Sequence, residues 1–324
     1  MTAANRRPKI LAARLLPPNV EARLARDFAA TSNPDDVIWS ADELVARAAG
    51  HDGMVVASSE KMTAEVIGRL PESVRIIATF SVGYEHIDVA AAARRGIVVT
   101  NTPDVLTDAT ADIAMLCMLG AARRAWEGER LLREGRWDRW ATTMLLGVHV
   151  TGKRLGIFGM GRIGRAVAQR ARGFSMEIHY HNRSRLPADE ELGATYHADP
   201  EALLPVSDFL SINSPSTPQT RKFLDARRIA LLPDGAVVVN TARGDIVDDT
   251  ALIAALRSGK VAAAGLDVFD GEPRLDPGYL ELENAMLLPH IGSATHETRD
   301  AMGYCCLDNL DAFFAGRPCP NALG

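Results

Sequence analysis

A short run, Arg154-Leu-Gly-Ile-Phe-Gly159-Met-Gly-Arg-Ile-Gly164, decides the fold of this chain. Its first five residues are typical of a buried strand, and a helical pattern begins within the glycines. Gly159 would allow a tight turn, Gly161 would let a pyrophosphate approach the backbone, and Gly164 would let the helix pack on the strand. Such glycines also suit an ordinary strand-to-helix turn. The strand before them, and the helix and second strand after them, favour a dinucleotide-binding βαβ unit.

Short β-branched runs alternate with longer helical stretches along the rest of the chain. Strands that alternate with helices are typical of parallel sheets covered on both faces, so we predict the α/β class with two doubly wound parallel-sheet domains. Ligands bind beyond the carboxyl ends of the strands in such sheets. The pattern predicts helices that include 41–49, 88–95 and a long buried helix at 104–124 that would join the domains, and strands at 9–15, 53–57, 75–80, 97–101, 154–158, 177–182, 208–213, 236–240, 262–268 and 285–288.

Length and composition agree with a folded protein of two domains. The chain has 324 residues, at roughly 100–200 residues per domain, with 47% hydrophobic and 24% charged residues. A net charge of -5 offers no basic field, so neither nucleic acid nor an anionic membrane is an expected partner. The longest uncharged apolar run, 113–122, is half of the roughly 20 residues that cross a bilayer.

The cysteines and histidines predict neither disulfides nor a metal site. Four cysteines are present, in a spacing that fits no disulfide framework and no paired zinc motif, which favours a reducing, cytoplasmic location. His179 and His181 alternate along one predicted strand, and no third ligand is apparent beside them. We interpret them as structural.

The turn after the second strand of the glycine unit bears on the coenzyme. A chain that selects NAD usually has an acidic residue here, which accepts from the ribose 2′-hydroxyl. This chain instead has the run Asn182-Arg183-Ser184-Arg185. A carboxylate would repel a 2′-phosphate, whereas these four side chains could donate hydrogen bonds to it. We therefore expect NADP(H) to be preferred and NAD(H) to be possible.

Three polar residues follow three later strands and suit the reduction of a 2-oxo acid. Arg243 comes after the predicted strand 236–240, Glu272 lies between Gly271 and Pro273, and His290 follows the strand 285–288. Each alone is more often an ordinary turn charge or a structural histidine. Together, arginine offers a planar fork to a carboxylate, histidine exchanges a proton near neutral pH, and a neighbouring glutamate would fix its tautomer and favour its protonated form.

These motifs together resemble the D-isomer-specific 2-hydroxyacid dehydrogenase family. The runs that carry the resemblance are 159–164, 240–245, 265–268, 271–273 and 288–295. Residues 81–84, 102–108 and 294–299 are similar, more narrowly, to glyoxylate and hydroxypyruvate reductases. The match extends from about residue 9 to residue 322.

The resemblance implies an architecture and a set of functional residues. A Rossmann cofactor domain, residues 104–290, would be inserted into a flavodoxin-like substrate domain made of 1–103 and 291–324. Arg243 and the backbone amides of Val82 and Gly83 would hold the substrate carboxylate. His290 would be the general acid in reduction, and Glu272 would orient it. The residues expected to bind the cofactor are Gly159, Gly161, Arg162, Ile163, Gly164, Asn182, Arg183, Ser184, Arg185, Ser214, Pro215, Thr241, Ala242, Asp267 and Gly292, with Asp267 near the nicotinamide amide.

The family also implies a homodimer, formed largely through the inserted domain. Trp137 and Trp140 resemble the paired tryptophans of the glyoxylate and hydroxypyruvate reductases, in which the second can reach the active site of the partner. Simple packing of two large aromatic side chains is the other interpretation. Trp140 is therefore included among the expected substrate-binding residues.

The sequence predicts an NADPH-preferring reductase of glyoxylate, hydroxypyruvate or a similar small 2-oxo acid, reversible toward the D-hydroxy acid. A broad D-2-hydroxyacid dehydrogenase is one alternative. Another is a dinucleotide-sensing binding protein like the co-repressors that share this fold. D-3-phosphoglycerate dehydrogenase is less favoured because no regulatory domain follows the last helix, and formate dehydrogenase because that relative departs from glutamate at the position of Glu272.

Overall fold

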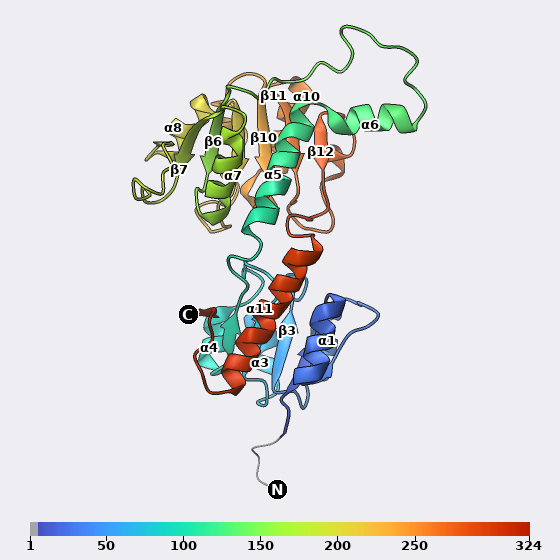
Figure 1. Cartoon of the computed structure of the whole chain (residues 1–324), viewed down its shortest axis with the longest axis vertical. Helices are drawn as coiled ribbons and strands as arrows, with labels where there is room; N and C mark the ends of the chain where they lie inside the picture. Colours follow the sequence, from blue (N-terminus) through green and yellow to red (C-terminus); the bar gives the residue numbers. More distant parts are fainter. Residues whose placement is uncertain (1–5) are drawn as a thin grey trace. The chain divides into compact units, whose positions relative to one another are not determined.

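The computed structural model describes residues 6–324, which form two compact units (Figure 1). Unit 1 holds the described residues up to Leu106 together with Ala294–Gly324, and unit 2 is Thr107–Ser293. The boundaries expected after residues 103 and 290 lie three residues before the observed ones, at 106 and 293. Each unit contains a sheet with helices on both faces, as the α/β pattern predicts.

The sheet of unit 1 has the strand order β13-β5-β4-β3-β1-β2. All its pairs are parallel except β13 with β5, an antiparallel edge pair that the sequence pattern missed. Successive side chains of a strand point to opposite faces of the sheet, so each strand contributes residues to two hydrophobic cores, one on each face. Ile10 and Ile76 pack with helices α1 and α11, whereas Leu11 and Ile77 pack with α2, α3 and α4. The strands are β1 (Lys9–Ala12), β2 (Ala29–Thr31), β3 (Gly53–Val56), β4 (Ile76–Thr79), β5 (Val98–Thr100) and β13 (Ala322–Leu323), and the helices are α1 (Pro18–Asp27), α2 (Ala41–Arg47), α3 (Ala64–Arg69), α4 (Val89–Arg94) and α11 (His296–Phe314).

Strand β1 ends three residues earlier than predicted. The chain turns at Arg14 and Leu15, where the Leu15 amide donates to Asp36 Oδ1 at 3.0 Å and Arg14 Nη2 donates to Asp36 Oδ2 at 2.8 Å. The Leu15 amide thus has a side-chain acceptor in place of a ladder bond that a longer strand would make.

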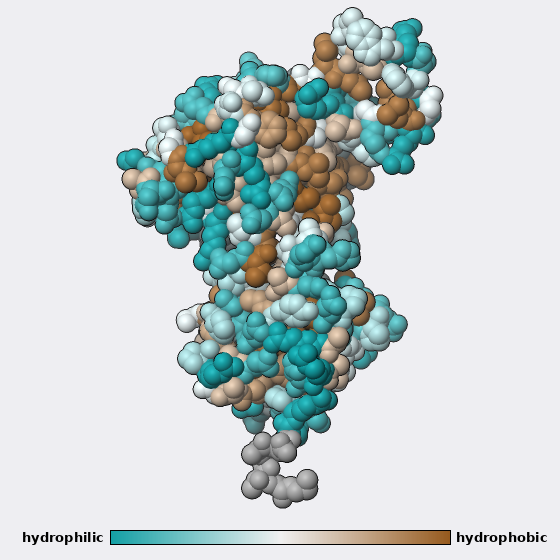
Figure 2. Space-filling view, viewed as in Figure 1, coloured by the Kyte–Doolittle hydropathy of each residue, from teal (hydrophilic) through white to brown (hydrophobic). Residues whose placement is uncertain are grey.

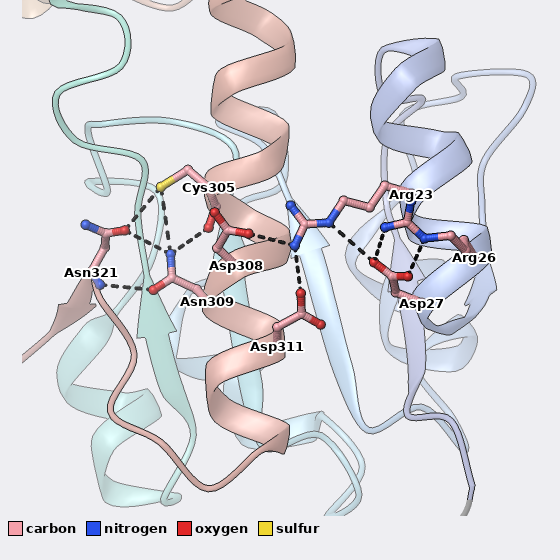
Figure 3. Close-up of polar contacts among 8 residues, drawn as sticks. All are labelled: Arg23, Arg26, Asp27, Cys305, Asp308, Asn309, Asp311 and Asn321. Carbon is pink, nitrogen blue, oxygen red and sulfur yellow. Dashed lines mark hydrogen bonds and ion pairs between the residues drawn. The ribbon is translucent and has the colours of Figure 1, made fainter.

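Polar contacts fasten the C-terminal helix α11 to the rest of unit 1 (Figure 3). Arg23 of α1 donates from Nη2 to Asp308 Oδ1 at 2.6 Å and to Asp311 Oδ2 at 2.7 Å. Asn309 is fully buried and exchanges two hydrogen bonds with Asn321, both of 3.0 Å. The Asn309 side chain therefore holds the segment between the end of α11 and the edge strand β13 against the helix.

The sheet of unit 2 is parallel throughout, with the strand order β12-β11-β10-β9-β6-β7-β8. One core packs α5 and α7 against Leu155, Ile157 and Val239, and the other packs α10 against Leu210 and Val238. The strands are β6 (Arg154–Phe158), β7 (Glu177–His181), β8 (Thr195–Tyr196), β9 (Phe209–Ile212), β10 (Ala236–Asn240), β11 (Val261–Leu266) and β12 (Ala285–Leu287), and the helices are α5 (Thr107–Ala122), α6 (Ala125–Arg133), α7 (Arg162–Arg172), α8 (Pro200–Leu203), α9 (Ala226–Ile229) and α10 (Asp249–Ser258).

The strand order reverses between β6 and β9. From β6 the chain adds β7 and β8 on one side, and it then returns to build β9 to β12 on the other. Ligands of doubly wound sheets bind at such a reversal, beyond the carboxyl ends of the strands. The glycine run follows β6 directly, so it lies at this point of the sheet.

Helix α6 and the segment after it, residues 125–150, form an arm that extends away from the sheet of unit 2 (Figure 1). Figure 2 shows apolar surface on this arm, which carries exposed large side chains. They are Trp126, Leu132, Trp137, Trp140 and Leu146, from 46% to 74% exposed. Among the helices of residues 6–324, none has the length and apolar character that a membrane span needs.

Candidate active site

The three glycines after β6 meet three different surroundings. Gly159 has a φ of +98°, and a Cβ there would lie 2.5 Å from the Ser214 backbone nitrogen. A Cβ on Gly164 would overlap the Gly159 carbonyl oxygen, so α7 packs on β6 only without a side chain there. Gly161 caps α7 with a φ of -78°, and apart from its chain neighbours no atom of residues 6–324 lies within 4 Å of a Cβ placed on it. That space lets a phosphate reach the first amides of α7.

Two buried hydroxyl groups end the neighbouring strands. Ser214 follows β9 and Thr241 follows β10, and each residue is 8% exposed. Neither hydroxyl has a hydrogen-bond partner among the residues that the structure describes. Buried polar groups are almost always paired, so unpaired hydroxyls at a ligand-binding edge indicate that a polar ligand completes them. Together with the space beside Gly161, they fit a dinucleotide.

The turn after β7 differs from the sequence expectation in how its side chains are engaged. Asn182 Oδ1 accepts from the Met160 amide at 2.7 Å, and Asn182 Nδ2 lies 3.3 Å from the Met160 carbonyl oxygen, to which it donates. Arg185 donates from Nε and Nη2 to Glu191 at 2.7 and 3.0 Å. Two of the four residues expected to meet a 2′-phosphate are thus already hydrogen-bonded within the protein. Arg183 and Ser184 are exposed at the tip of the turn.

Asn240, the last residue of β10, shapes the turn that presents Arg243. Its side-chain amide donates to the Arg243 carbonyl oxygen at 2.8 Å, and its side-chain oxygen accepts from the Ala242 amide at 3.0 Å. Asn240 is 1% exposed, so these bonds form in a site where an unpaired amide would be costly. The sequence motif contains this residue, but its supporting role appears only in the structure.

A glycine then brings this turn against the chain that follows β11. A Cβ on Gly244 would overlap the backbone of Phe269 and Asp270. The absence of a side chain at Gly244 lets the two loops touch, which carries Arg243 into the neighbourhood of Glu272. The Arg243 charge is one of the influences that favour the Glu272 carboxylate.

Glu272 and His290 form the hydrogen bond expected from the sequence. His290 Nδ1 donates to Glu272 Oε2 at 2.7 Å, and Glu272 Oε1 accepts from the Phe269 amide at 2.8 Å. Burial opposes ionisation of Glu272, but the hydrogen bond and charge of His290, the Phe269 amide and Arg243 together hold the pKa of Glu272 below its ordinary value. Because a carboxylate only accepts, Nδ1 carries a proton and Nε2 is the nitrogen that exchanges one.

Asp267 supports the backbone directly after His290. His290 has a φ of +54°, a left-handed conformation that few residues other than glycine adopt. The two oxygens of Asp267 accept from the Ile291 and Gly292 amides at 2.7 and 2.8 Å. Burial raises the pKa of Asp267, although these amides and the charge of His290 favour its carboxylate form. Asp267 thus holds the strained turn in place, and its contact with a nicotinamide amide stays a prediction.

The other residues expected to bind substrate are Val82 and Gly83 in unit 1 and Trp140 in unit 2. In unit 1 the carbonyl oxygens of Val82 and Gly83, after β4, accept from Asn101 Nδ2 at 2.8 Å and from Ser81 Oγ at 2.7 Å, which fixes the orientation of their peptide groups. Trp140 is 74% exposed on the arm of unit 2. The roles of these residues in substrate binding stay predictions.

Sequence reasoning missed a histidine and a glutamate near the turn after β7. His197 Nε2 lies 3.1 Å from His179 Nδ1, and burial together with the neighbouring imidazoles lowers the pKa of His197. No group of three or more metal-ligating side chains occurs within residues 6–324. Glu191 lies in a polar loop whose sequence singles out none of its acidic residues, so only the fold reveals that its side chain is buried.

The arrangement in unit 2 can hold a carboxylate and move a proton. The Arg243 guanidinium can bind a carboxylate, and its Nη1 donates to the Ala242 carbonyl oxygen at 2.7 Å. His290 can give a proton from Nε2 to an oxygen, and the Glu272 carboxylate stabilises the protonated imidazole before that transfer. A bound nicotinamide dinucleotide would supply hydride exchange, held by the glycine loop, Ser214 and Thr241. The fold and these residues define a dinucleotide-dependent oxidoreductase.

Comparison with known proteins identifies the family. The model of the "D-isomer specific 2-hydroxyacid dehydrogenase, NAD binding domain" matches residues 115–292. The chain is 44% identical over 317 residues to the glycerate dehydrogenase of Hyphomicrobium methylovorum, covering 97% of this chain and 98% of that protein. It is 42% identical over 322 residues to the glyoxylate reductase of Thermococcus litoralis, covering 98% and 97%.

A solved structure agrees with these relatives. The NADPH-dependent glyoxylate/hydroxypyruvate reductase of Sinorhizobium meliloti, in complex with NADP and malonate, superposes with a TM-score of 0.88 at 37% identity, covering 98% of this chain and 97% of that one. The chain therefore belongs to the D-isomer-specific 2-hydroxyacid dehydrogenase family. It is an NAD(P)-dependent 2-hydroxyacid dehydrogenase with a Rossmann cofactor domain, and the fold class predicted from the sequence is confirmed.

Alanine at Gly161 and at Gly164 should separate dinucleotide binding from stability. Gly161→Ala places a methyl group in open space at an ordinary φ, so it should change the free energy of unfolding by less than about 0.5 kcal/mol. The same methyl group blocks the approach of a phosphate and should weaken dinucleotide binding about tenfold or more. Gly164→Ala should instead destabilise the apoprotein by about 1–3 kcal/mol, because α7 must move away from β6. Denaturant unfolding of the apoprotein and fluorescence titration with NADPH measure the two effects. Wild-type affinity in Gly161→Ala would contradict this assignment.

Glu272→Gln should move the pH profile of reduction toward acid. Reduction needs protonated His290, so its rate falls as pH rises, whereas oxidation needs neutral His290 and rises with pH. A neutral amide no longer favours the imidazolium, so the fall should begin at lower pH. The measurement is kcat/KM against pH, with a deuterated coenzyme to verify that hydride transfer limits the rate. Glu281→Gln, which removes an exposed carboxylate paired with Arg257, is the matched control. An unmoved limb in Glu272→Gln would argue against the pairing.

Proposed function

We propose that this protein is an NADPH-preferring reductase of glyoxylate, hydroxypyruvate or a similar small 2-oxo acid, reversible toward the D-2-hydroxy acid. The observation that carries the proposal is the hydrogen bond of 2.7 Å between His290 Nδ1 and Glu272 Oε2, with Arg243 nearby. A proton donor and a carboxylate-binding guanidinium are the two groups that reduction of a 2-oxo acid requires beside a hydride source. The names of the relatives, glyoxylate reductase and glycerate dehydrogenase, agree with a substrate of this size.

Substrate binding in this proposal divides between side chain and backbone donors. Arg243 holds the substrate carboxylate through its planar fork, and the amides of Val82 and Gly83 add further donors. His290 Nε2 gives its proton to the carbonyl oxygen during reduction and recovers one during oxidation. In the homodimer, Trp140 reaches the active site of the partner and contributes apolar contact to the substrate side chain there.

The coenzyme preference rests on the turn after β7. The position where an NAD-selecting enzyme carries an acid holds Asn182, so no carboxylate repels a 2′-phosphate there. Arg183 and Ser184 are exposed and make no hydrogen bond or ion pair with other described residues, so they are the donors that we assign to the phosphate. The 2′-phosphate of NADPH then accepts a charge-assisted hydrogen bond from Arg183, which NADH cannot form because it lacks this phosphate.

The exposed arm of unit 2 supports a homodimer. Large apolar side chains gathered on one projecting segment mark an interaction surface, and residues 125–150 carry five of them. The partner on this surface is a second copy of the chain, and light scattering of the purified protein measures the mass directly. The cytoplasmic location stays a prediction.

Arg243→Ala should lower kcat/KM for glyoxylate and hydroxypyruvate by about 100-fold or more, and Arg243→Lys should restore only part of it. The physical reason is that a single ammonium cannot reproduce two parallel bonds to a carboxylate. A substrate panel should include an aldehyde without a carboxylate, for which the loss should be much smaller. Arg257→Ala, an exposed arginine paired with Glu281 on another face, is the control. Equal losses of kcat/KM for the 2-oxo acid and the aldehyde would contradict the assignment of Arg243 to the substrate carboxylate.

Wild-type enzyme should show a higher kcat/KM with NADPH than with NADH at saturating 2-oxo acid. Arg183→Ala should lower this ratio about tenfold, because one charge-assisted contact to phosphate corresponds to about 1.4 kcal/mol. Asn182→Asp should lower the NADPH to NADH ratio of kcat/KM because its carboxylate repels the 2′-phosphate, while kcat/KM with NADH should be unchanged or higher. Arg185→Ala should have a smaller effect than Arg183→Ala, since Arg185 is already paired with Glu191. A wild-type ratio in favour of NADH would refute the coenzyme assignment.

A further inference from the structure

A buried carboxylate lies beneath the turn that follows β7. Glu191 is 6% exposed, although it belongs to the polar loop between β7 and β8. Its Oε1 accepts from the Tyr180 hydroxyl at 2.7 Å and from Arg185 Nε at 2.7 Å, and its Oε2 accepts from Arg185 Nη2 at 3.0 Å. One carboxylate thus connects the strand β7 to a residue of the turn.

Tyrosine hydroxyls from β7 and β8 fasten both ends of the same turn. Tyr180 is fully buried, and its oxygen accepts from the Leu186 amide at 3.1 Å. Tyr196 of β8 donates from its hydroxyl to the Asn182 carbonyl oxygen at 3.2 Å. Residues 182, 185 and 186 are therefore tied down, and the segment between them carries Arg183 and Ser184 into solvent.

The two arginines of the turn have different tasks in this geometry. The Arg185 guanidinium makes two charge-assisted bonds to a carboxylate that is itself buried, and breaking such a pair leaves a buried charge without its partner. The hydrogen-bond donors of Arg185 therefore stabilise the turn. Those of Arg183 are left to bind a ligand.

Ionisation of the network agrees with this division. The hydrogen bonds from Arg185 and from Tyr180 hold the pKa of Glu191 below its ordinary value, so the carboxylate is charged at neutral pH. Burial raises the pKa of Tyr180, so its phenol keeps the proton that it donates. The Glu191 carboxylate is therefore an acceptor at neutral pH.

We propose that Glu191 is a positioning residue for coenzyme selectivity, which fixes the turn 182–186 through Arg185 and Tyr180 and so aims Arg183 at the 2′-phosphate of NADPH. The inference rests on the NADPH preference proposed above and adds the group that maintains it. Glu191 itself touches no coenzyme atom in this assignment. Its influence on NADPH passes through the conformation of the turn.

The test compares Glu191→Gln with Glu190→Gln, using dissociation constants of NADPH and NADH for the apoprotein. Glu190 lies one residue away and pairs with Arg165 Nη1 at 2.5 Å, so its variant removes the same charge without touching the turn. Relative to that control, Glu191→Gln should raise the Kd for NADPH about threefold to tenfold and change the Kd for NADH less than twofold. Thermal unfolding of the apoprotein reports separately on stability.

A double-mutant cycle then shows whether Arg185 acts through Glu191. Arg185→Ala, a change at an exposed side chain, should shift the NADPH to NADH ratio as Glu191→Gln does, and the double variant should be no worse than either single variant. In an Arg183→Ala background neither change should alter the ratio. Arg185→Ala also keeps the proposal testable where Glu191→Gln fails to fold.

Three results would overturn the inference. Equally weakened binding of NADPH and NADH in Glu191→Gln would mean that Glu191 has only a structural role. Tighter NADPH binding than in the control would mean that a released Arg185 reads the phosphate. Additive losses in the cycle would mean that Arg185 contacts the phosphate directly. The ratio of the NADPH and NADH dissociation constants in the wild type tests the proposed NADPH preference by itself. The changes in these constants from Glu190→Gln to Glu191→Gln test the role of Glu191. A failure of the proposed function can therefore be distinguished from a failure of this inference.

Discussion

Parallel pairing of all strands in the unit 2 sheet is the constraint on which the site depends. Because β6, β9, β10, β11 and β12 run in one direction, their carboxyl ends meet at one edge. The glycine loop, Ser214, Thr241, Arg243 and His290 follow these ends, although more than 120 residues of sequence separate the first from the last. A sheet buried on both faces leaves this edge as the place where polar side chains can gather without disturbing a core.

Arg243 and His290 are each held by a neighbouring polar residue. Asn240 fixes the turn of Arg243, Glu272 binds the ring of His290, and Asp267 holds the amides that follow it. Asn240 and Asp267 are buried, and the side-chain oxygens of all three supports accept hydrogen bonds from the backbone or from histidine. A site held in this way loses little freedom when a ligand binds, because its conformation is set beforehand.

The pairing of buried polar groups also distinguishes support from ligand contact. The side-chain oxygens of Asp267, Glu191 and Asn240 are satisfied within the protein, so they act on their neighbours. The hydroxyls of Ser214 and Thr241 have no partner within residues 6–324 and lie at the edge where a dinucleotide binds. The same reasoning separates Arg185, which is paired with Glu191, from Arg183, which makes no hydrogen bond or ion pair with other described residues. The hydrogen-bond partners of a buried polar group therefore indicate its role more specifically than its residue type does.

The sequence by itself determined the α/β class and the βαβ unit at Gly159–Gly161–Gly164, and it singled out Arg243, Glu272 and His290 as candidate site residues. It could do so because glycine spacing and strand periodicity are local, and because residues that follow parallel strands must meet at one edge. It missed the edge strands β2, β8 and β13, each of two or three residues, since runs of that length carry no period. Only the tertiary structure decided that Asn182 holds the glycine loop, that Asp267 supports the turn after His290, and that Glu191 is buried under Arg185. Those roles depend on which donors surround each side chain, and contacts between loops from different strands are set by packing, which no local pattern encodes.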